Sequence, residues 1–362
     1  MLSSTVFIRP TTSQDQGAWN HYVCNHPGGT AYQLSGFIRA VEAAYRFKSI
    51  CFVAQSRQQN QGRVQGILPL IHLHAPFTKG ALVSLPYCDA GGVLADSPET
   101  EAALLAHAMA YAAQKKIPEV AIRSVKPFAG LDPNLTRHSG KVRMVRALPD
   151  DPNCLLGSLK SKVRSQVKKP MRDGLKFHMG GRRLLPLFYR IFCENMHDLG
   201  SVVHSFEWFY RILAFYGSRA HIGVVTTPAG EPAAAGMILC HPCLVSVPWA
   251  SSLRRFNSLN PNMLLYWGFL SFAAANGFKM LDFGRSTPDA GTFRFKKQWG
   301  AVPVDLHWAA FDPAVFPHLA PSKKQPAGRS GMKRNLAEAV IRKLPGPVST
   351  GLGVLTRKYI SL

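Results

Sequence analysis

The sequence predicts an α/β fold built from two similar halves, and three observations support this. Hydrophobic residues make up 46% of the chain, a fraction typical of proteins that bury extended cores. Short β-rich segments alternate with helical segments in both halves. Residues 110–124, AYAAQKKIPEVAIRS, also resemble residues 272–286, FAAANGFKMLDFGRS. Each copy reads as a helix end, a turn, a strand and Arg-Ser. We therefore predict a duplicated domain, with chance similarity as the alternative.

The first half combines strands, a hairpin and a helix. A short strand is predicted at residues 6–9. Residues 50–54 and 64–71 are β-rich and flank a polar connection, which predicts a hairpin. The alanine-rich stretch 101–113 predicts a helix, and residues 119–122 predict the strand that follows it.

The second half repeats that order. Strands are predicted at residues 222–226 and 234–240 around a turn at 228–231, and again at 244–249. A helix is predicted over residues 261–275, with Asn260 as its N-cap, Pro261 at its first position and Gly277 at its end. A strand at 279–283 comes next.

Proline, aspartate and asparagine cluster near residues 148–157, which predicts a joint between the halves. We expect a first domain at residues 1–150, a second at 151–312, and a basic linker and tail at 313–362. Within the tail, residues 322–334 have linker composition and 335–344 predict a short helix. Residues 351–362 mix apolar and basic side chains, which suits either docking on the protein or lying on a membrane surface.

The net charge of +23 comes mainly from two zones. Residues 158–190 contain ten Lys or Arg and one acidic residue, and residues 320–362 contain nine and one. Such zones attract nucleic acid, anionic lipid headgroups or phosphorylated substrates. A solvated basic face without a dedicated ligand is the alternative.

Two further features concern the compartment. The seven cysteines form an odd number without framework spacing, which predicts reduced thiols. The N-terminus lacks a signal-peptide pattern, and the longest apolar run, 263–275, is too short to span a bilayer. We expect a cytoplasmic protein that can work at the inner face of the membrane.

One basic segment, residues 158–172, predicts an amphipathic helix. Apolar residues recur every fourth position from 159 to 171, and cations occupy the other faces. Pro170 is expected to bend or end this helix. Arg164, Lys168 and Lys169 are our candidate phosphate-binding residues.

Residues 282–300, DFGRSTPDAGTFRFKKQWG, carry the strongest functional signal. A strand is predicted to end at Phe283, and a loop of glycine and small hydroxyl residues follows it, where α/β proteins usually place their sites. Alternating aromatic and basic residues then predict a strand with Arg294 and Lys296 on one face. A cation held there can stabilise an oxyanion.

This stretch resembles the C-terminal signature of the FemAB-like acyltransferases. It is most similar to the branch found beside exosortase (PEP-CTERM) and exopolysaccharide gene clusters. The segments 26–30 (HPGGT), 84–92 (SLPYCDAGG) and 162–171 resemble the same branch. The resemblance covers about residues 15–305.

The resemblance implies two tandem GNAT-like domains, with mixed central sheets flanked by helices and a short basic C-terminal tail. It also implies acyl or aminoacyl transfer to an amine without a metal. The family's Phe-Lys pair matches Phe295 and Lys296, and this lysine is implied to stabilise the tetrahedral intermediate. The chain has no inserted coiled-coil arm of the kind that some members use for tRNA.

Lys296 and Asp282 are therefore our candidate catalytic residues. Asp282 and Asp289 are candidate proton acceptors, although Asp282 can instead hold the loop through hydrogen bonds. The candidate substrate-binding residues are Arg285, Ser286, Thr292, Arg294 and Phe295, together with Tyr87 and Asp89 of a loop in the first half.

Two other patterns give weaker evidence of a functional site. Cys240 and Cys243 have C-x-x-C spacing but no second cysteine pair and no redox setting. His72 and His74 share a strand face without a partner that would complete a zinc site. We expect no metal and no nucleotide-binding glycine motif.

We expect no tightly bound cofactor. The acyl donor would be a co-substrate: acyl-CoA, acyl carrier protein or aminoacyl-tRNA. The acceptor would be a phosphorylated or nucleotide-linked envelope or exopolysaccharide precursor, with peripheral contact to anionic membrane. The alternatives are an aminoacyl-tRNA-dependent transferase for a peptidoglycan precursor, and a non-catalytic protein that binds RNA or anionic membrane.

Overall fold

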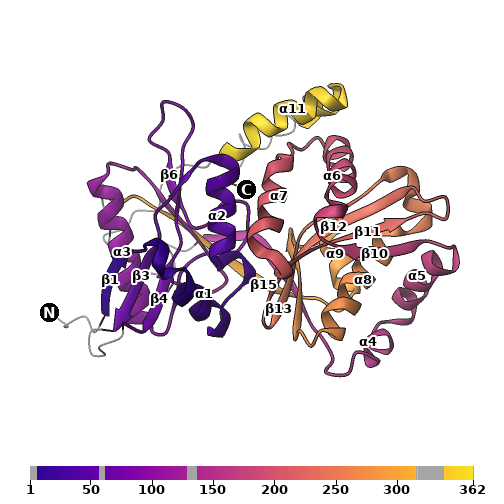
Figure 1. Ribbon diagram of the computed structural model, residues 1–362, viewed down its shortest axis with the longest axis horizontal. Helices are drawn as coiled ribbons and strands as arrows, with labels where there is room; N and C mark the ends of the chain where they lie inside the picture. Colours follow the sequence, from indigo (N-terminus) through magenta and orange to yellow (C-terminus); the bar gives the residue numbers. More distant parts are fainter. Residues whose placement is uncertain (1–5, 57–61, 129–136, 315, 317–337, 362) are drawn as a thin grey trace. The chain divides into compact units, whose positions relative to one another are not determined.

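The computed structural model describes residues 6–56, 62–128, 137–314, 316 and 338–361, and the chain divides into two compact units (Figure 1). The first unit comprises Met1–Val142, Val304–Lys324 and Tyr359–Leu362. The second comprises Arg143–Pro303 and Gln325–Lys358. The segment after Val304 joins the first unit because its strand pairs there. The domain limits predicted from the sequence stay a prediction.

The first unit contains two sets of paired strands. Strands β1 (Val6–Pro10), β3 (Phe52–Ser56), β4 (Val64–Leu68) and β7 (Leu94–Ala95) form an antiparallel sheet in that order. The second set runs in the order β15 (Val302–Phe311), β8 (Val120–Ser124), β6 (Ala81–Val83), β5 (Ile71–Leu73) and β2 (Lys48–Ser49). Only β6 and β8 pair in parallel within this second set. The predicted hairpin is thus confirmed as β3 and β4.

The described part of the first unit also contains the α-helices α1 (Gln16–Asn25), α2 (Ser35–Tyr45) and α3 (Pro98–Gln114). Helix α3 starts with Pro98 at its first position, and the Ser97 side chain accepts a hydrogen bond from the Thr100 amide. It packs against β3 and β4, where Gly66 leaves room for Thr100 and Leu104. The core of the unit lies at this contact.

The second unit has one mixed sheet. Its strands are β10 (Lys176–Gly180), β11 (Ala220–Thr226), β12 (Pro232–His241), β13 (Leu244–Ser252) and β14 (Met280–Ser286). Strand β9 (Arg137–Ala147) lies next to β14, and its residues from Arg143 onward belong to this unit. Strands β10 to β13 pair antiparallel, and β13 pairs with β14 in parallel. The strands predicted at residues 222–226, 234–240, 244–249 and 279–283 are confirmed.

The α-helices of the second unit are α4 (Cys154–Gly157), α5 (Ser161–Arg172), α6 (Leu185–Leu199), α7 (Phe206–Tyr216), α8 (Pro261–Ala275), α9 (Gly291–Gln298) and α11 (Gly346–Thr356). Residues 338–343 are also helical, as predicted for 335–344, whereas the predicted linker 322–334 lies outside the described residues. None of the described helices has both the length and the apolar character needed to cross a bilayer.

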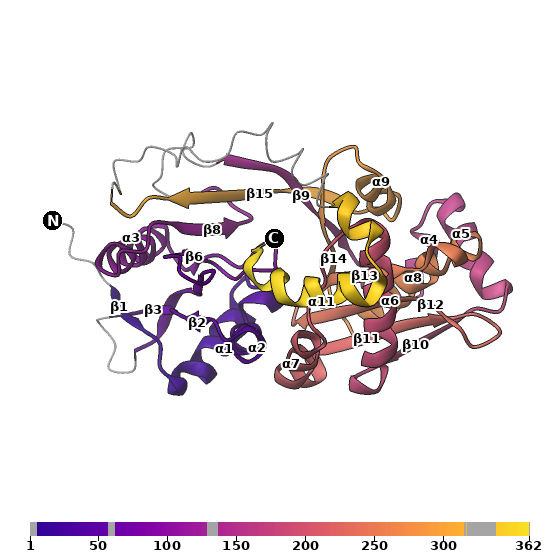
Figure 2. The same cartoon turned by 90° about the horizontal axis from the view of Figure 1, so that it is seen from above.

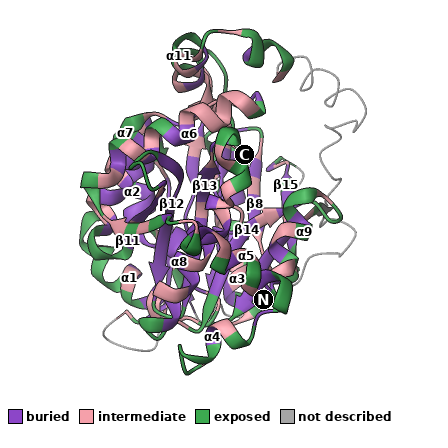
Figure 3. Cartoon of the chain, turned by 90° about the vertical axis from the view of Figure 1, so that its right-hand side faces the viewer, coloured by how far each residue is buried: buried purple, intermediate pink, exposed green. Residues whose placement is uncertain are grey.

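Helices α6 and α8 pack on opposite sides of this sheet (Figure 1). Glycine makes the close approach of α8 possible, because a Cβ at Gly223 or Gly236 would come within 2.6 or 2.9 Å of the Phe269 ring. Figure 3 shows buried residues along the strands and exposed residues on the outer surfaces of the helices. Pro261 begins α8 as predicted, but the Asn260 side chain makes no capping hydrogen bond.

The internal repeat is visible in both units. Helix α3 is followed by β8, and α8 is followed by β14 (Figure 2). Arg123 and Arg285 therefore occupy matching positions near the ends of their strands. The predicted α/β fold class is confirmed, and the same helix–strand order recurs in the two units.

An aromatic cluster around His204 supports the second unit. The imidazole stacks on Trp208, with ring centroids 5.6 Å apart, and also contacts the Phe209 and Trp249 rings. His204 is only 3% exposed. Burial, and then the charge of Arg357, place the pKa of His204 well below its ordinary value of 6.5.

We predict that His204 makes the protein less stable in mild acid. Below pH 6.5 the unfolded chain binds a proton at this histidine and the folded chain does not, so protonation favours unfolding. The free energy of unfolding should fall by up to about 1.4 kcal/mol per pH unit more in the wild type than in a His204→Phe variant. Urea unfolding between pH 7 and 5 checks this, and equal slopes for the two proteins would contradict it.

Candidate active site

The parallel ladder between β13 and β14 is short. It joins Leu244 to Met280 and ends with Ser246 opposite Asp282, although both strands continue to Ser252 and Ser286. The two strands therefore separate beyond Asp282. This is the carboxyl end of the parallel pair, the place where α/β sheets usually hold their ligands.

Gly284 shapes the strand at this point. Its φ of +75° lies in the left-handed region, which residues with a side chain rarely adopt. Its amide donates a hydrogen bond of 2.8 Å to Oδ1 of Asp282. A Cβ here would lie 3.5 Å from the Val247 carbonyl oxygen and 4.0 Å from Nζ of Lys296. Because Gly284 has no side chain, Lys296 can lie close to the backbone of β13 and β14.

Asp282 is a buried anchor for this backbone. The residue is 2% exposed, and its Oδ2 accepts a 2.8 Å hydrogen bond from Nε of Arg143 on β9. Its other oxygen accepts the Gly284 amide. Because both carboxylate oxygens have structural partners, the geometry supports the alternative in which Asp282 holds the loop.

The expectation of a strand after this loop is wrong, because residues Gly291–Gln298 form helix α9. Alternation of aromatic and basic residues over such a short stretch is also compatible with helical spacing, and the aromatic packing decides between the two. Phe295 and Trp299, four positions apart, both lie against the Tyr266 ring of α8, with centroids 5.2 and 6.4 Å away. Arg294 and Lys296 consequently do not share a face: Arg294 is exposed and Lys296 is buried.

Lys296 reaches the point where the strands separate. The residue is 8% exposed, and its Nζ donates a 2.8 Å hydrogen bond to the main-chain carbonyl of Arg285. A lysine ammonium carries three N–H donors, so this bond is compatible with donation to a bound substrate. The arrangement holds a positive charge against the backbone of β14.

Arg146 fixes the end of α9 and was not identified from the sequence. Its guanidinium donates to the Trp299 carbonyl, which ends the helix, and to Oγ of Ser158 at 2.5 Å. Burial lowers the pKa of Arg146 from its ordinary value. Arg143 was also missed. The available signal was two arginines within an apolar stretch, VRMVRA, that forms a strand.

The remaining candidates of this stretch lie on β14 and α9 or between them. Arg285 and Phe295 are half-buried, and Thr292 is exposed, as is Asp289. Ser286 is only 3% exposed, and its Oγ has no hydrogen-bond partner among the residues that the structure describes. A buried hydroxyl in this state is suited to a ligand that supplies the missing bond.

The basic helix α5 uses two of its three candidate phosphate ligands in structural bonds. Arg164 donates to the Leu159 carbonyl at 2.7 Å. Lys169 pairs with Asp173 at 2.6 Å and donates to the Ser258 carbonyl at 3.0 Å. Lys168 is exposed. Pro170 does not end the helix, which continues to Arg172.

Tyr87 and Asp89 belong to the first unit, whereas the residues above belong to the second. The loop is conformationally unusual, because Leu85 and Tyr87 both have positive φ, 52° and 68°. The Tyr87 amide donates to the Ser361 carbonyl at 2.7 Å, so the C-terminus docks here. The Asp89 carbonyl accepts a 3.0 Å hydrogen bond from the Trp308 indole.

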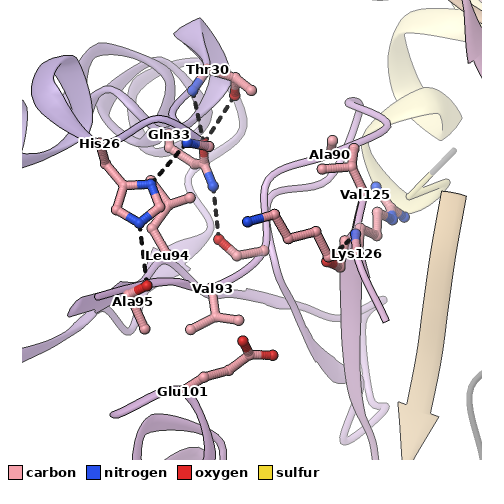
Figure 4. Close-up of a pocket in the computed structure, with 14 residues that line it drawn as sticks. His26, Thr30, Gln33, Ala90, Val93, Leu94, Ala95, Glu101, Val125 and Lys126 are labelled. Atoms are coloured by element: carbon pink, nitrogen blue, oxygen red, sulfur yellow. Dashed lines mark hydrogen bonds between the residues drawn. The ribbon is translucent and has the colours of Figure 1, made fainter. Parts of the chain in front are cut away.

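A pocket in the first unit lies near the carboxyl end of β8 (Figure 4). Gln33 links two segments of the pocket wall. The amide of the Gln33 side chain donates to the Gly92 carbonyl at 3.0 Å, and the side-chain oxygen accepts from the Thr30 amide. Lys126 and Glu101 extend into it (Figure 4). The sequence segments 26–30 and 84–92 thus meet at one pocket.

Within the described ranges, the side chains of His, Cys, Asp and Glu form no group of three or more that could hold an ion. The C-x-x-C pair is divided, because Cys240 is buried in β12 and Cys243 is exposed.

Comparisons with known proteins bear on this geometry. Residues 160–297 match the family model described as an acetyltransferase (GNAT) domain. No match was found among curated protein sequences.

Among solved structures, the crystal structure of FemX aligns with a TM-score of 0.66 at 15% identity, over 83% of this chain and 96% of that one. A tandem GNAT protein from the clavulanic acid biosynthesis pathway gives 0.55 at 12% identity, over 85% and 98%. L-PGS from Bacillus licheniformis gives 0.54 at 13% identity, over 93% and 99%.

These comparisons establish two points. Over 83% and 85% of its length, the chain has the fold of FemX and of the tandem GNAT protein. The second unit contains a GNAT acyltransferase domain, so the protein is a transferase of acyl groups. The match begins at α5 and ends within α9, and it therefore includes Asp282, Gly284 and Lys296.

We predict that breaking the Arg143–Asp282 pair destabilises the second unit. Arg143→Met leaves a buried carboxylate without its cation, which should cost about 3–5 kcal/mol in the free energy of unfolding. Replacing both residues, as Arg143→Met with Asp282→Leu, removes the uncompensated charge and should recover much of that loss. Chemical denaturation of the wild type, the Arg143→Met variant and the double variant checks this. An Arg143→Met variant as stable as the wild type would refute it.

We also predict that Gly284→Ala is costly although the residue is small. The positive φ of Gly284 should make alanine destabilising by about 1 kcal/mol or more, and the added methyl group lies beside Lys296. A matched control is Gly230→Ala, whose φ of +82° is equally strained but whose Cβ meets nothing within 4 Å. Both variants should lose stability, and only Gly284→Ala should also lose turnover. Equal turnover in the two would argue against a site here.

Proposed function

We propose that the chain is an N-acyltransferase that moves an acyl or aminoacyl group onto an amine of an exopolysaccharide or cell-envelope intermediate. The observation that carries the proposal is the buried Lys296, held against the Arg285 carbonyl where β13 and β14 separate. The GNAT match over residues 160–297 supports the acyl-transfer class.

For this reaction the protein mainly has to position the two substrates and stabilise the charge that develops on the carbonyl oxygen. The acceptor amine attacks the carbonyl carbon of an ester or thioester, and a C–N bond forms. The carbonyl oxygen becomes an oxyanion, which Lys296 stabilises from a site with little water. The intermediate collapses with cleavage of the C–O or C–S bond, and the amine proton passes to the departing oxygen or sulfur.

We assign the neighbouring residues supporting roles. Asp282 positions the Gly284 turn and is not the proton acceptor, because both its oxygens have structural partners. The buried Oγ of Ser286 donates to, or accepts from, the bound substrate. Arg285, Thr292 and Phe295 stay candidates for contact with the substrate, as does Arg294, which lies on the exposed side of α9. Tyr87 and Asp89 of the first unit stay candidate substrate-binding residues.

The donor is a co-substrate: acyl-CoA, acyl carrier protein or aminoacyl-tRNA. Exposed cations on and next to α5, namely Lys160, Lys162, Lys168 and Arg172, form a surface suited to a phosphate-rich donor. This surface favours one second candidate function, aminoacyl-tRNA-dependent modification of a peptidoglycan precursor. The exopolysaccharide acceptor and the exosortase-associated setting rest on the sequence resemblance of residues 282–300.

We predict that Lys296→Ala lowers kcat by about 10²–10³ with little change in KM, because the oxyanion contact exists only in the transition state. Lys296→Arg should retain part of the activity. The matched control is Lys297→Ala on the exposed face of the same helix, which should behave like the wild type.

The assay should supply each of the three donor classes with amine acceptors, and follow transfer by mass spectrometry. Transfer from charged tRNA to a nucleotide-linked muropeptide would select the second candidate function. Full turnover by Lys296→Ala would overturn the role of the lysine. RNA binding with steep salt dependence, and no transfer from any donor, would favour the non-catalytic alternative.

A further inference from the structure

Helix α11 packs on the rest of the second unit through the small residues on one of its faces. A Cβ at Gly353 would come within 2.7 Å of the Val203 amide nitrogen, so this face of the helix lies directly against backbone. Ser349, four positions earlier and on the same face, is 6% exposed. Helix α11 also contacts α6. The helix is therefore docked on the protein, which is one of the two alternatives predicted for residues 351–362.

The large apolar residues of α11 lie on a different face of the helix, which is exposed. Val348, Leu352 and Leu355 are 54%, 44% and 67% exposed. Their spacing of four and three positions places them on one face, which we call the outer ridge. Figure 3 shows exposed residues along α11. A helix docked on a globular protein normally has the opposite arrangement, with large apolar residues inside and small or polar ones outside.

The charge around the outer ridge is positive. Arg342 and Lys343 precede α11, and Arg357 and Lys358 follow it. From residue 339 to the end of the sequence there is no Asp or Glu. The nearest acidic residue before it, Glu338, pairs with Arg342 at 3.8 Å. On α6, Glu194 and Asp198 are paired with Arg255 and Arg254.

We propose that the outer ridge of α11 binds the surface of an anionic lipid bilayer. An aliphatic ridge flanked by Lys and Arg is the arrangement of helices that lie in the membrane interface, with the apolar side chains among the acyl chains and the cations at the headgroups. This surface is separate from the Lys296 site, and the inference does not depend on the proposed acyl transfer.

Other occupants fit the ridge less well. RNA would be attracted by the cations but would gain nothing from three aliphatic side chains. A second copy of the chain would need about 800 Å² per partner for a stable interface, far more than three half-exposed side chains supply. A bilayer has no such minimum area and accepts both the apolar ridge and the cations.

The test is co-sedimentation with vesicles of phosphatidylglycerol and phosphatidylcholine in equal parts, compared with phosphatidylcholine alone. The wild type should partition to the anionic vesicles at least about tenfold more strongly, since burial of the apolar ridge and attraction of the cations to the headgroups act together. Leu352→Asp with Leu355→Asp should reduce that partitioning about tenfold. Lys343→Gln with Lys358→Gln should reduce mainly the part that depends on salt.

A matched control is Phe7→Asp with Val302→Asp, which adds the same charge at residues that are 51% and 60% exposed and lie outside α11. It should bind vesicles within about twofold of the wild type, since two added carboxylates alone are a modest repulsion. All variants should keep the wild-type circular dichroism spectrum. Equal loss in the control, no preference for anionic vesicles, or a dimer that the Leu352→Asp and Leu355→Asp substitutions convert to a monomer would each overturn the proposal.

Discussion

The buried carboxylate of Asp282 is the group on which the candidate site depends. One of its oxygens binds the Arg143 guanidinium and the other binds the Gly284 amide. The first bond neutralises a charge inside the sheet, and the second fixes the left-handed turn of β14. That turn directs the Arg285 carbonyl at Lys296. A single buried side chain thus links β9, which lies next to β14, to the lysine on α9.

Packing supports the same geometry from the other side. Helix α9 is short, and it is held by Phe295 and Trp299 against Tyr266 and by Arg146 at its last carbonyl. Tyr266 in turn stacks on Phe283 of β14, with centroids 5.4 Å apart. Lys296 is therefore positioned by two elements that share one aromatic core, which reduces the movement needed at the moment of reaction.

Much of the fold was predictable because its signals are local. The α8 helix follows from Pro261, a long apolar run and Gly277, and the hairpins follow from β-rich runs around turns. The candidate lysine was predictable too, from the Phe295-Lys296 pair in its family-like context. The helical state of residues 291–298 was not, because it depends on contacts with Tyr266 of α8.

Arg143 and Arg146 could not be assigned roles from the sequence for the same reason. They contact Asp282 and Trp299, which lie about 140 and 150 residues later in the chain, and local periodicity contains no information on such pairs. The docked face of α11 is a third case. Its small inner and large outer residues read as an ordinary mixed segment until the contact of Gly353 with Val203 shows which face is covered.

The central claim is that Asp282 acts through Lys296 and not as a separate base. A double-mutant cycle in kcat/KM with Asp282→Asn, Lys296→Met and the double variant tests it most directly, with circular dichroism as the check on folding. The account predicts that Asp282→Asn lowers kcat/KM in the wild-type background and has almost no further effect once Lys296 is methionine. Independent, multiplicative losses from the two substitutions would contradict it.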